Sequence, residues 1–342
     1  MDSEPVQTPR AVTIYDVALA AGVSPSTVSR ALARPGRVSA ATAAKVRAAA
    51  ATLGYQRAST APALATVPSR LIAMIVADIG NPVFVDIIRG AEEATDAAGY
   101  TMVLVDARES DVRERTAAEQ FLPAVDGLIL TSPRLADSGI RVLAKQRPVV
   151  VLNRVVRGLP SVLTDAARGV RRAAEHLGQL GHREVTYLSG PEASWTDGVR
   201  WRSLEEAGIE LELRTRRVGP HEPTTAGGEQ AARAWARNPT TGVVAFNDVM
   251  AIGFIRGLRA LGVEVPRDVS VVGFDNSRTG ALTRPALTSV ASPLSLQGST
   301  AVRNLMAIIG GAMSSQQPVV LPVKLVPRAS TSRARTGRLT LM

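Results

Sequence analysis

Helical spacing of apolar residues marks the segment that follows the first dozen residues. Within 14–21, the apolar side chains recur at the i, i+3, i+4, i+7 spacing of one helix face: Ile14, Val17, Ala18 and Ala21. Gly22 follows at the point where such a helix would end, because glycine adopts a left-handed backbone at little steric cost. The pattern predicts a helix over 14–21 that ends at Gly22.

Capping residues predict two more helices directly after the first. Ser24 can cap a helix over 25–33, and Pro25 takes its first position, where the missing N–H costs no hydrogen bond. Ser39 is placed in the same way before a third helix over 40–53. Two short helices joined by a glycine-centred turn have the proportions of a helix-turn-helix, although an ordinary pair of helices fits the periodicity equally well.

The predicted packing separates an apolar inner face from a polar outer face. Five apolar residues are expected to hold the first two helices together: Val17, Ala20, Val23, Val28 and Leu32. This arrangement leaves Ser26, Thr27, Ser29 and Arg30 facing outwards. Hydroxyl groups at a helix N-terminus suit contacts to phosphate oxygens, and an arginine one turn later can reach a guanine edge.

Beyond residue 57 the pattern changes twice. Residues 57–70 contain two prolines and lack an apolar face, which is typical of a linker. From Leu71 onwards, short β-branched runs alternate with helical stretches; the runs are 71–78, 101–106, 127–132, 148–153, 184–190, 242–248 and 268–275. Nearly continuous apolar strands separated by helices indicate parallel sheets covered on both faces. We expect an α/β fold of two doubly wound lobes with a ligand cleft between them.

Composition and charge narrow the class of partner. The net charge of the 342 residues is +10, and residues 1–70 carry eight basic against three acidic side chains, so half of the excess lies near the N-terminus. This bias favours an anionic partner there, with nucleic acid and a membrane surface both open on charge alone. The chain has no cysteine, no signal-like start and no apolar run of membrane-spanning length. We therefore expect a soluble cytoplasmic protein, associated with the nucleoid if it binds DNA.

The residues themselves carry a family resemblance. Fixed letters recur at fixed spacing in the N-terminal segment: Asp-Val-Ala at 16–18, Gly-Val-Ser at 22–24, Thr-Val-Ser-Arg at 27–30, Val-Ser at 38–39 and Gly-Tyr at 54–55. The segment resembles the DNA-binding head of the lactose-repressor (LacI/GalR) family. The resemblance implies a head over 11–56 that binds double-stranded DNA through Ser24, Pro25, Ser26, Thr27, Ser29 and Arg30.

In that family the linker forms a short hinge helix on operator DNA, and a leucine from each subunit wedges into the minor groove. The matching residue by spacing is Leu64. Two departures bear on this match: Arg57-Ala58 replaces the usual Pro-Asn, and Pro62 falls where a helix-compatible residue is usual. The sequence leaves open whether a hinge helix forms or the segment acts as a mobile tether.

The resemblance extends over most of the remaining chain, through segments in family order: 77–84, 125–130, 148–154, 176–191, 246–248, 269–276, 284–290 and 326–331. It implies a periplasmic-binding-protein-like sensor over 71–331 with three crossovers. The implied boundaries place lobe 1 at about 71–165 and 292–322, and lobe 2 at about 166–291 and 323–331. Residues 332–342 form a basic tail that we expect to be disordered, and without a further C-terminal heptad a homodimer is favoured over a tetramer.

Ligands of such sheets bind beyond the carboxyl ends of the strands, where several polar residues fall. We expect these to contact a small polar effector: Asp78, Asn81, Phe84, Trp195, Arg200, Asn247 and Asp275. Carboxylates and amides can bind vicinal hydroxyls, an aromatic ring can stack on a sugar, and Arg200 matches the family's effector-contacting arginine. Alternatively, Asp78 and Asp248 cap helices and Asp275 orders a loop.

A sugar fits this set best, with a nucleobase or another polar metabolite left open. Ser203 stands where the family commonly has glycine, and the segment 201–210 is shorter than usual, so we expect the helix there to be trimmed.

Enzyme signatures are missing from the sequence. No HExxH, GxGxxG, P-loop or GxSxG motif occurs, and His182 is expected to be structural. We therefore expect no catalysis, no cofactor and no metal. The preferred hypothesis is an effector-responsive transcriptional regulator, most often a repressor by resemblance. The alternatives are the solute-binding protein of a transporter and a sugar-processing α/β enzyme.

Overall fold

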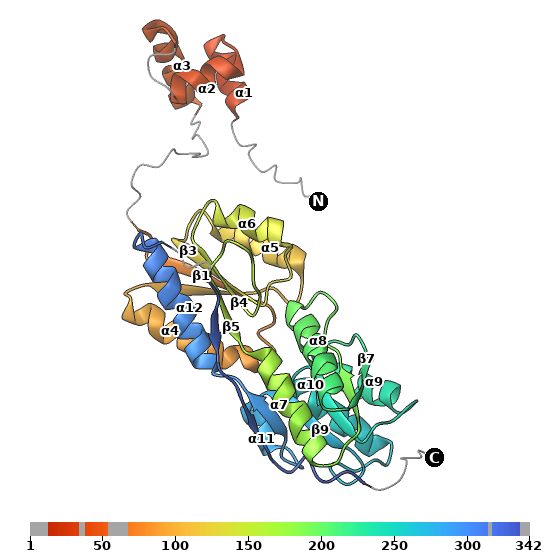
Figure 1. Cartoon of the computed structure of the whole chain (residues 1–342). Coiled ribbons are helices and arrows are strands. Elements are labelled where there is room, and N and C mark those ends of the chain that lie inside the picture. Colours follow the sequence, from red (N-terminus) through yellow and green to blue (C-terminus); the bar gives the residue numbers. More distant parts are fainter. Residues whose placement is uncertain (1–12, 34–37, 54–67, 314–316, 336–342) are drawn as a thin grey trace, which may run out of the picture. The chain divides into compact units, whose positions relative to one another are not determined.

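The computed structural model describes residues 13–33, 38–53, 68–313 and 317–335. Contacts divide the chain into two units, 1–67 and 68–342, which we treat separately as the head and the sensor (Figure 1). Leu64, Arg57 and Pro62 lie outside the described residues, so the hinge helix remains a prediction.

The head consists of three helices around a small apolar core. They are α1 (Ile14–Ala21), α2 (Pro25–Ala33) and α3 (Ala40–Thr52), close to the predicted ranges. Gly22 adopts φ 64° at the end of α1, as predicted, and Ser39 caps α3 by accepting a hydrogen bond from the Thr42 N–H at 3.2 Å. Six residues form the buried core: Val17, Ala18, Val28, Ala31, Val46 and Ala50.

One packing prediction for the head is wrong. Ala20 is exposed, whereas Ala18 is buried in its place. The reason is that α3 packs against both other helices and adds Val46 and Ala50 to the core, which turns the buried face of α1 toward Val17 and Ala18. Val23 and Leu32 are partly buried beside this core.

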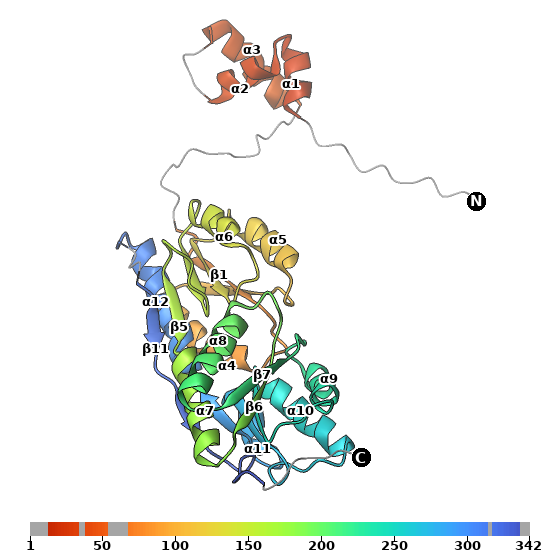
Figure 2. The ribbon, with the colours of Figure 1, turned by 45° about the vertical axis from the view of Figure 1, so that its right-hand side comes forward.

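The sensor contains two six-stranded sheets, each covered by helices (Figures 1 and 2). The sheet of lobe 1 has the order β11-β5-β4-β3-β1-β2, with parallel pairs throughout. Its strands are β1 (Leu71–Val76), β2 (Thr101–Asp106), β3 (Gly127–Thr131), β4 (Val149–Leu152), β5 (Ser161–Thr164) and β11 (Val319–Leu321). Its helices are α4 (Val83–Ala97), α5 (Asp111–Phe121), α6 (Asp137–Ala144) and α12 (Leu294–Ile309).

The sheet of lobe 2 has the order β12-β10-β9-β8-β6-β7, in which β12 runs antiparallel to β10. Its strands are β6 (Glu184–Leu188), β7 (Arg214–Val218), β8 (Gly242–Ala245), β9 (Ser270–Asp275), β10 (Thr288–Ala291) and β12 (Lys324–Val326). Its helices are α7 (Ala166–Gln179), α8 (Trp195–Glu210), α9 (Thr225–Trp235), α10 (Asp248–Ala260) and α11 (Arg278–Leu282). The chain passes between the sheets three times, after β5, β10 and β11, as the family resemblance implied.

Central strands are fully buried because helices lie on both faces of each sheet, which explains their continuous apolar runs. In lobe 1, α4 and α12 approach closely enough to require glycine. A Cβ on Gly90 would lie 2.0 Å from the Ser295 carbonyl oxygen, and one on Gly298 would lie 2.0 Å from that of Ile87. This contact fixes the N-terminal half of α12 against the lobe.

One further expectation about the sensor is wrong. Residues 332–335 are not a disordered tail: the Ala334 N–H donates to the Leu180 carbonyl at 2.8 Å, and the Ser332 N–H donates to the Ser270 hydroxyl at 3.0 Å. Extended chain can continue along lobe 2 because polar groups of that lobe accept its N–H groups. The helix α8 spans sixteen residues and ends at Glu210, and its trimming relative to the family stays a prediction. Among the described helices, none has the length and apolar character needed to span a bilayer.

Candidate DNA-binding and effector sites

The second helix of the head presents its polar residues to solvent. Ser26, Ser29 and Arg30 are exposed, and Pro25 and Thr27 are half-buried at the start of α2. Ser24 is exposed and serves as the cap, because its hydroxyl accepts a hydrogen bond from the Thr27 N–H at 3.3 Å. The same hydroxyl lies 2.9 Å from that of Thr27 and 3.0 Å from that of Ser26. The helix N-terminus therefore carries a cluster of hydroxyls with an arginine one turn further on, a set suited to phosphate and base contacts.

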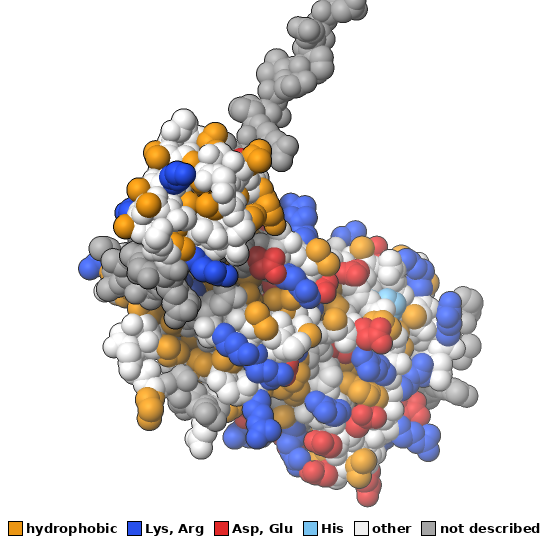
Figure 3. All heavy atoms as spheres, turned by 90° about the horizontal axis from the view of Figure 1, so that it is seen from above, with side chains coloured by type: hydrophobic (Ala, Val, Ile, Leu, Met, Phe, Trp, Pro, Cys, Tyr) orange, Lys and Arg blue, Asp and Glu red, His pale blue; other side chains and the backbone are white. Residues whose placement is uncertain are grey.

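Charge on the sensor is distributed differently. Basic and acidic side chains alternate over the face of the sensor that Figure 3 shows. Ion pairs occur elsewhere on the sensor surface too, as between Arg171 and Glu210 at 2.5 Å and between Arg267 and Glu264 at 2.9 Å. Pairing with carboxylates offsets part of the basic charge of the sensor.

A cavity of about 550 Å³ of empty space, partly open to solvent, lies between the two lobes. Lobe 1 and the crossover after β10 contribute Asn81, Val83, Phe84, Glu109, Ser132, Arg134, Asn153, Thr164, Ser292, Leu294 and Gln297. Lobe 2 contributes Ser194, Thr196, Arg200, Pro223, Phe246, Asn247 and Asp275. The mixed polar and aromatic lining is typical of a small-molecule site.

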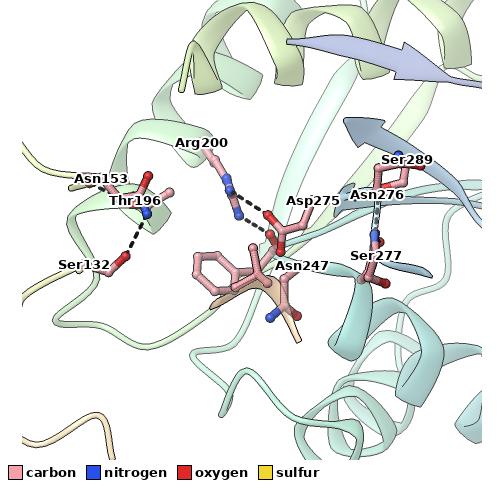
Figure 4. Close-up of polar contacts among 12 residues, drawn as sticks. Ser132, Asn153, Thr196, Arg200, Asn247, Asp275, Asn276, Ser277 and Ser289 are labelled. Carbon is pink, nitrogen blue, oxygen red and sulfur yellow. Dashed lines mark hydrogen bonds and ion pairs between the residues drawn. The ribbon is translucent and has the colours of Figure 1, made fainter. Parts of the chain in front are cut away.

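Arg200 is the central cation of the lobe 2 wall. It projects from α8 toward Asp275, with its Nη2 3.6 Å from the Asp275 Oδ1, and its Nη1 donates to the Phe246 carbonyl (Figure 4). The guanidinium lies 3.6 Å from the ring centroid of Phe274 and 5.0 Å from that of Phe246. Held by the Asp275 carboxyl group, a carbonyl and two aromatic rings, Arg200 is fixed before any ligand arrives.

Asp275 ends β9 in a backbone conformation that is rare for a residue with a side chain, with φ 104°. The carboxyl group is buried, and this burial raises its pKa to about 8 against the opposing effect of Arg200. The neighbouring Asp248 is also buried, with its pKa raised to about 6, although it accepts hydrogen bonds at 2.6 Å from the Ser289 hydroxyl and the Ser277 N–H. Asp248 therefore orders the loop after β9 instead of lining the cavity.

Three other predicted residues also line the cavity. Asn247 caps α10 by accepting a hydrogen bond from the Met250 N–H at 2.9 Å, and its amide Nδ2 is buried without a partner among the described residues. Asn81 accepts from the Val83 N–H at 3.2 Å, and Phe84 packs against the core of lobe 1 at the start of α4. Both follow the carboxyl end of β1, which is where the ligands of parallel sheets are expected to bind.

Two predicted residues do not line the cavity. The Asp78 carboxylate accepts a hydrogen bond from the Gly80 N–H at 2.9 Å, so it stabilises the turn before α4. Trp195 is half-buried at the start of α8, one residue from the cavity-lining Ser194 and Thr196. Helical geometry turns consecutive side chains by about 100°, which separates Trp195 from its neighbours.

An ion pair on the lobe 1 wall is missing from the predicted set. The Arg134 Nε donates to the Glu109 Oε2 at 2.6 Å, and Arg134 also donates to the Ser132 carbonyl at 3.2 Å. Glu109 is largely buried, and desolvation raises its pKa despite the attraction of Arg134. Each residue follows the end of a strand by three positions, β2 for Glu109 and β3 for Arg134, so a search for polar residues after every strand would have pointed to this pair.

Asn153 connects the two walls of the cavity. Its Nδ2 donates to the Ser132 hydroxyl at 3.0 Å, and its backbone carbonyl accepts from the Thr196 hydroxyl of lobe 2 at 3.1 Å (Figure 4). Gln297 of α12 donates to the Asn153 Oδ1 at 2.7 Å. Asn153 directly follows β4, and Ser132 directly follows β3. A search for polar residues just after every predicted strand would therefore have identified both.

The loop that carries Ser194 is held by a buried carboxylate. Asp197 accepts hydrogen bonds from the Tyr187 hydroxyl at 2.9 Å, the Gly190 N–H at 2.7 Å and the Arg217 guanidinium at 2.6 Å. These bonds connect the start of α8 to β6 and β7. They keep the lobe 2 wall in place beneath Arg200.

No histidine is found among the described residues that line the cavity. His182 is buried, with its ring nitrogens 2.9 Å from the Thr241 hydroxyl and 3.0 Å from the Ser270 hydroxyl, as expected of a structural residue. The described residues include no group of three or more His, Cys, Asp or Glu side chains placed to hold a metal ion.

Comparison with known proteins agrees with this geometry. Residues 13–58 match the family described as bacterial regulatory proteins, lacI family, and residues 174–331 match the periplasmic binding protein-like domain. The HTH-type transcriptional regulator DegA of Bacillus subtilis (strain 168) is 33% identical over 337 residues, which cover 95% of this chain and 99% of that protein.

Solved structures show the same architecture. The lac repressor dimer bound to operator and an anti-inducer has a TM-score of 0.71 at 29% identity, covering 94% of this chain and 100% of that one. The complex of the transcriptional regulator CelR with cellobiose has a TM-score of 0.70 at 27% identity, covering 93% and 99%. These relatives are regulators and not enzymes, in agreement with the preferred hypothesis. The chain therefore belongs to the lacI family of bacterial regulatory proteins, as a DNA-binding transcriptional regulator with a helix-turn-helix head and a two-lobed sensor.

Proposed function

We propose that this regulator is a repressor whose operator affinity is set by an uncharged sugar bound in the cavity between the lobes. The observation that carries the proposal is the lining of the cavity, in which neutral amides and hydroxyls outnumber charged side chains: Asn81, Ser132, Asn153, Thr164, Ser194, Thr196, Asn247, Ser292 and Gln297. Its two arginines already have partners in the protein, Arg134 in Glu109 and Arg200 in Asp275 and the Phe246 carbonyl. A neutral ligand with many hydroxyls matches the amides and hydroxyls that remain.

Five of the predicted residues are proposed as effector contacts: Asn81, Phe84, Arg200, Asn247 and Asp275. The amides and the ion pair would bind hydroxyls, and Phe84 would contact an apolar sugar face. Cellobiose in the CelR complex supports a sugar in this class of cavity. Asp78 and Trp195 are left out because neither lines it.

On the DNA side, Ser24, Pro25, Ser26, Thr27, Ser29 and Arg30 are proposed to meet the major groove. The exposed hydroxyls would bind phosphates and nearby base edges, and the guanidinium of Arg30 would pair with a guanine. Two heads from a homodimer would then occupy the half-sites of a roughly palindromic operator. A protein that works on chromosomal DNA in this way acts in the cytoplasm, at the nucleoid.

Coupling between the two sites is proposed to act through the lobes. Thr196 bonds to Asn153 across the cavity, and Arg278 of lobe 2 lies 3.7 Å from Asp86 of lobe 1. A ligand that contacts both walls favours one relation of the lobes over another. A change of tenfold to hundredfold in operator affinity would require about 1.4–2.8 kcal/mol of differential binding.

The test uses the reciprocity of coupled binding. If the sugar changes the affinity for operator by some factor, the operator must change the affinity for the sugar by the same factor. Operator binding by the full chain would be measured by fluorescence anisotropy with and without each sugar that raises the melting temperature. The sugar Kd would then be measured with and without operator. The sugar is expected to change the Kd for operator by the same factor by which the operator changes the Kd for the sugar. A sugar that binds but leaves operator affinity unchanged would contradict the proposed regulation.

A further inference from the structure

Gln297 is a buried amide in the lobe 1 wall of the cavity. Its side chain has no exposed surface, yet the residue lines the cavity. The Nε2 group donates to the Asn153 Oδ1 at 2.7 Å and to the Val162 carbonyl at 3.2 Å. Both of its N–H groups are therefore used, and both partners are acceptors. This assigns the orientation of the amide, because a flipped group would place Oε1 against two acceptors.

The other end of the same amide has no partner. Oε1 is buried and accepts no hydrogen bond from any described residue. A structural role that ties α12 to β4 and β5 explains the Nε2 bonds but leaves Oε1 unaccounted for. A buried acceptor without a donor costs free energy, so such an atom in a ligand cavity indicates a donor that arrives with the ligand.

Gln297 has little freedom to find another partner. The close contacts at Gly90 and Gly298 hold this part of α12 against α4, and the Gln297 backbone N–H donates to the Pro293 carbonyl at 2.9 Å. The side chain is thus fixed at both ends, by the helix and by Asn153. A preorganised group of this kind discriminates strongly, because it does not relax when its partner is absent.

The opposite wall carries the complementary groups. Two donors of lobe 2, the Arg200 Nε and the Asn247 Nδ2, are also buried without partners in the described chain. An occupant of the cavity would accept hydrogen bonds from lobe 2 and donate one to lobe 1. A hydroxylated compound does both, because each hydroxyl is donor and acceptor.

We propose that Gln297 is a specificity-determining residue, whose Oε1 accepts a hydrogen bond from one hydroxyl of the effector. This inference rests on the proposed function, since it assigns a role within the same cavity. It requires the regulator to reject an analogue that lacks this hydroxyl, even where the rest of the molecule is unchanged. Nothing in the motifs or strand ends of the sequence identifies Gln297, because it lies inside a helix.

The experiment compares Gln297→Met with the full wild-type chain. Methionine is similar in length but has no amide, and Gln146→Met is the matched control on an exposed residue of lobe 1. D-ribose, D-xylose, D-glucose, D-galactose and cellobiose would be titrated by calorimetry. The expected result is a loss of about tenfold to a hundredfold in affinity for the bound sugar with Gln297→Met, and no change with Gln146→Met.

Monodeoxy analogues of that sugar then separate recognition from packing. One analogue should bind wild type about tenfold more weakly or worse and suffer little further loss with Gln297→Met, as a double-mutant cycle requires. An equal loss for the parent sugar and every analogue would overturn the inference and leave the sugar hypothesis intact. If no sugar binds wild type, the sugar hypothesis itself fails and the role of Gln297 fails with it. Should Gln297→Met not fold, Gln297→Asn, which retracts the amide by one methylene, is judged by the same outcomes.

Discussion

The α2 helix of the head and the cavity of the sensor represent two ways of holding functional side chains. On α2, Ser26, Ser29 and Arg30 are exposed on a helix supported by a core of six small or medium side chains. In the cavity, Arg200 and Asp275 are buried and already bonded to the protein. The head depends on its partner to order its side chains, whereas the sensor fixes them in advance.

This difference determines what a substitution costs. Removing an exposed side chain from α2 should affect DNA binding and leave folding unchanged. Removing a buried group from the cavity should affect both ligand binding and stability, because its partner is left unsatisfied. The predictions below test this contrast.

The largest effect is expected for Arg200→Met. This substitution leaves Asp275 and the Phe246 carbonyl without their cation, so stability should fall by about 3–5 kcal/mol and sugar affinity by at least about a hundredfold. Chemical unfolding followed by tryptophan fluorescence measures the loss of stability, because all three tryptophans (Trp195, Trp201 and Trp235) lie in the sensor. The exposed Arg202→Met on the same helix is the control. Equal behaviour of the two variants would refute the buried role of Arg200.

Next in size is the pH dependence caused by Asp275. Its folded pKa of about 8 exceeds the ordinary value of 3.8, so the folded state binds more protons between these limits. The associated stability is complete below about pH 4 and is lost as the pH rises through about 8. With about 1.4 kcal/mol per pKa unit over the three units from pH 5 to the folded pKa, wild type should lose roughly 4 kcal/mol more than Asp275→Asn between pH 5 and 9. If the free energy of unfolding changed with pH by the same amount in wild type and in Asp275→Asn, the burial of this carboxyl would be contradicted.

A smaller loss, confined to DNA, is expected for Arg30→Ala. Affinity for the operator should fall by about 1–3 kcal/mol, while binding to random duplex changes little and the melting temperature stays the same. Arg47→Ala, an exposed arginine of α3, should instead weaken both kinds of duplex to a similar and lesser degree. Anisotropy titrations with the two duplexes decide the matter. Equal losses on both duplexes for Arg30→Ala would remove it from base reading.

The smallest effect concerns the cap of α3. Ser39→Ala removes the hydrogen bond to the Thr42 N–H and should destabilise the head by about 1 kcal/mol. Hydrogen exchange resolved by region would show faster exchange in residues 13–53 of the variant than of wild type. Exchange in the sensor should keep its wild-type rate. Faster exchange in both units would mean that they do not unfold independently.

Local signals explain which parts of the fold were predictable. Gly22 and Ser39 define helix ends through backbone conformation and capping, which depend on neighbours in sequence, so the head helices were predicted closely. The buried runs of β1, β3 and β8 were equally clear. In contrast, β7 reads RTRRV and was missed, because a half-exposed edge strand lacks a continuous apolar run.

The cavity was predicted in part for a related reason. Strand ends can be located from sequence, so Asn81, Asn247 and Asp275 were found. Arg134 follows the end of β3 and could have been found in the same way, whereas Gln297 comes from a helix interior, and only the three-dimensional packing of lobe 1 brings it to the wall. The turn that draws the Asp78 carboxylate away was equally invisible, because it depends on a single bond to the Gly80 N–H.

The central claim is that α2 reads bases in a major groove. The most direct measurement selects duplexes from a random pool with the purified full chain, then titrates the best duplex against random competitor at low salt, with and without sugars. The account predicts a preference of at least about a thousandfold for a roughly palindromic site. Equal affinity for selected and random duplexes under every condition would contradict it.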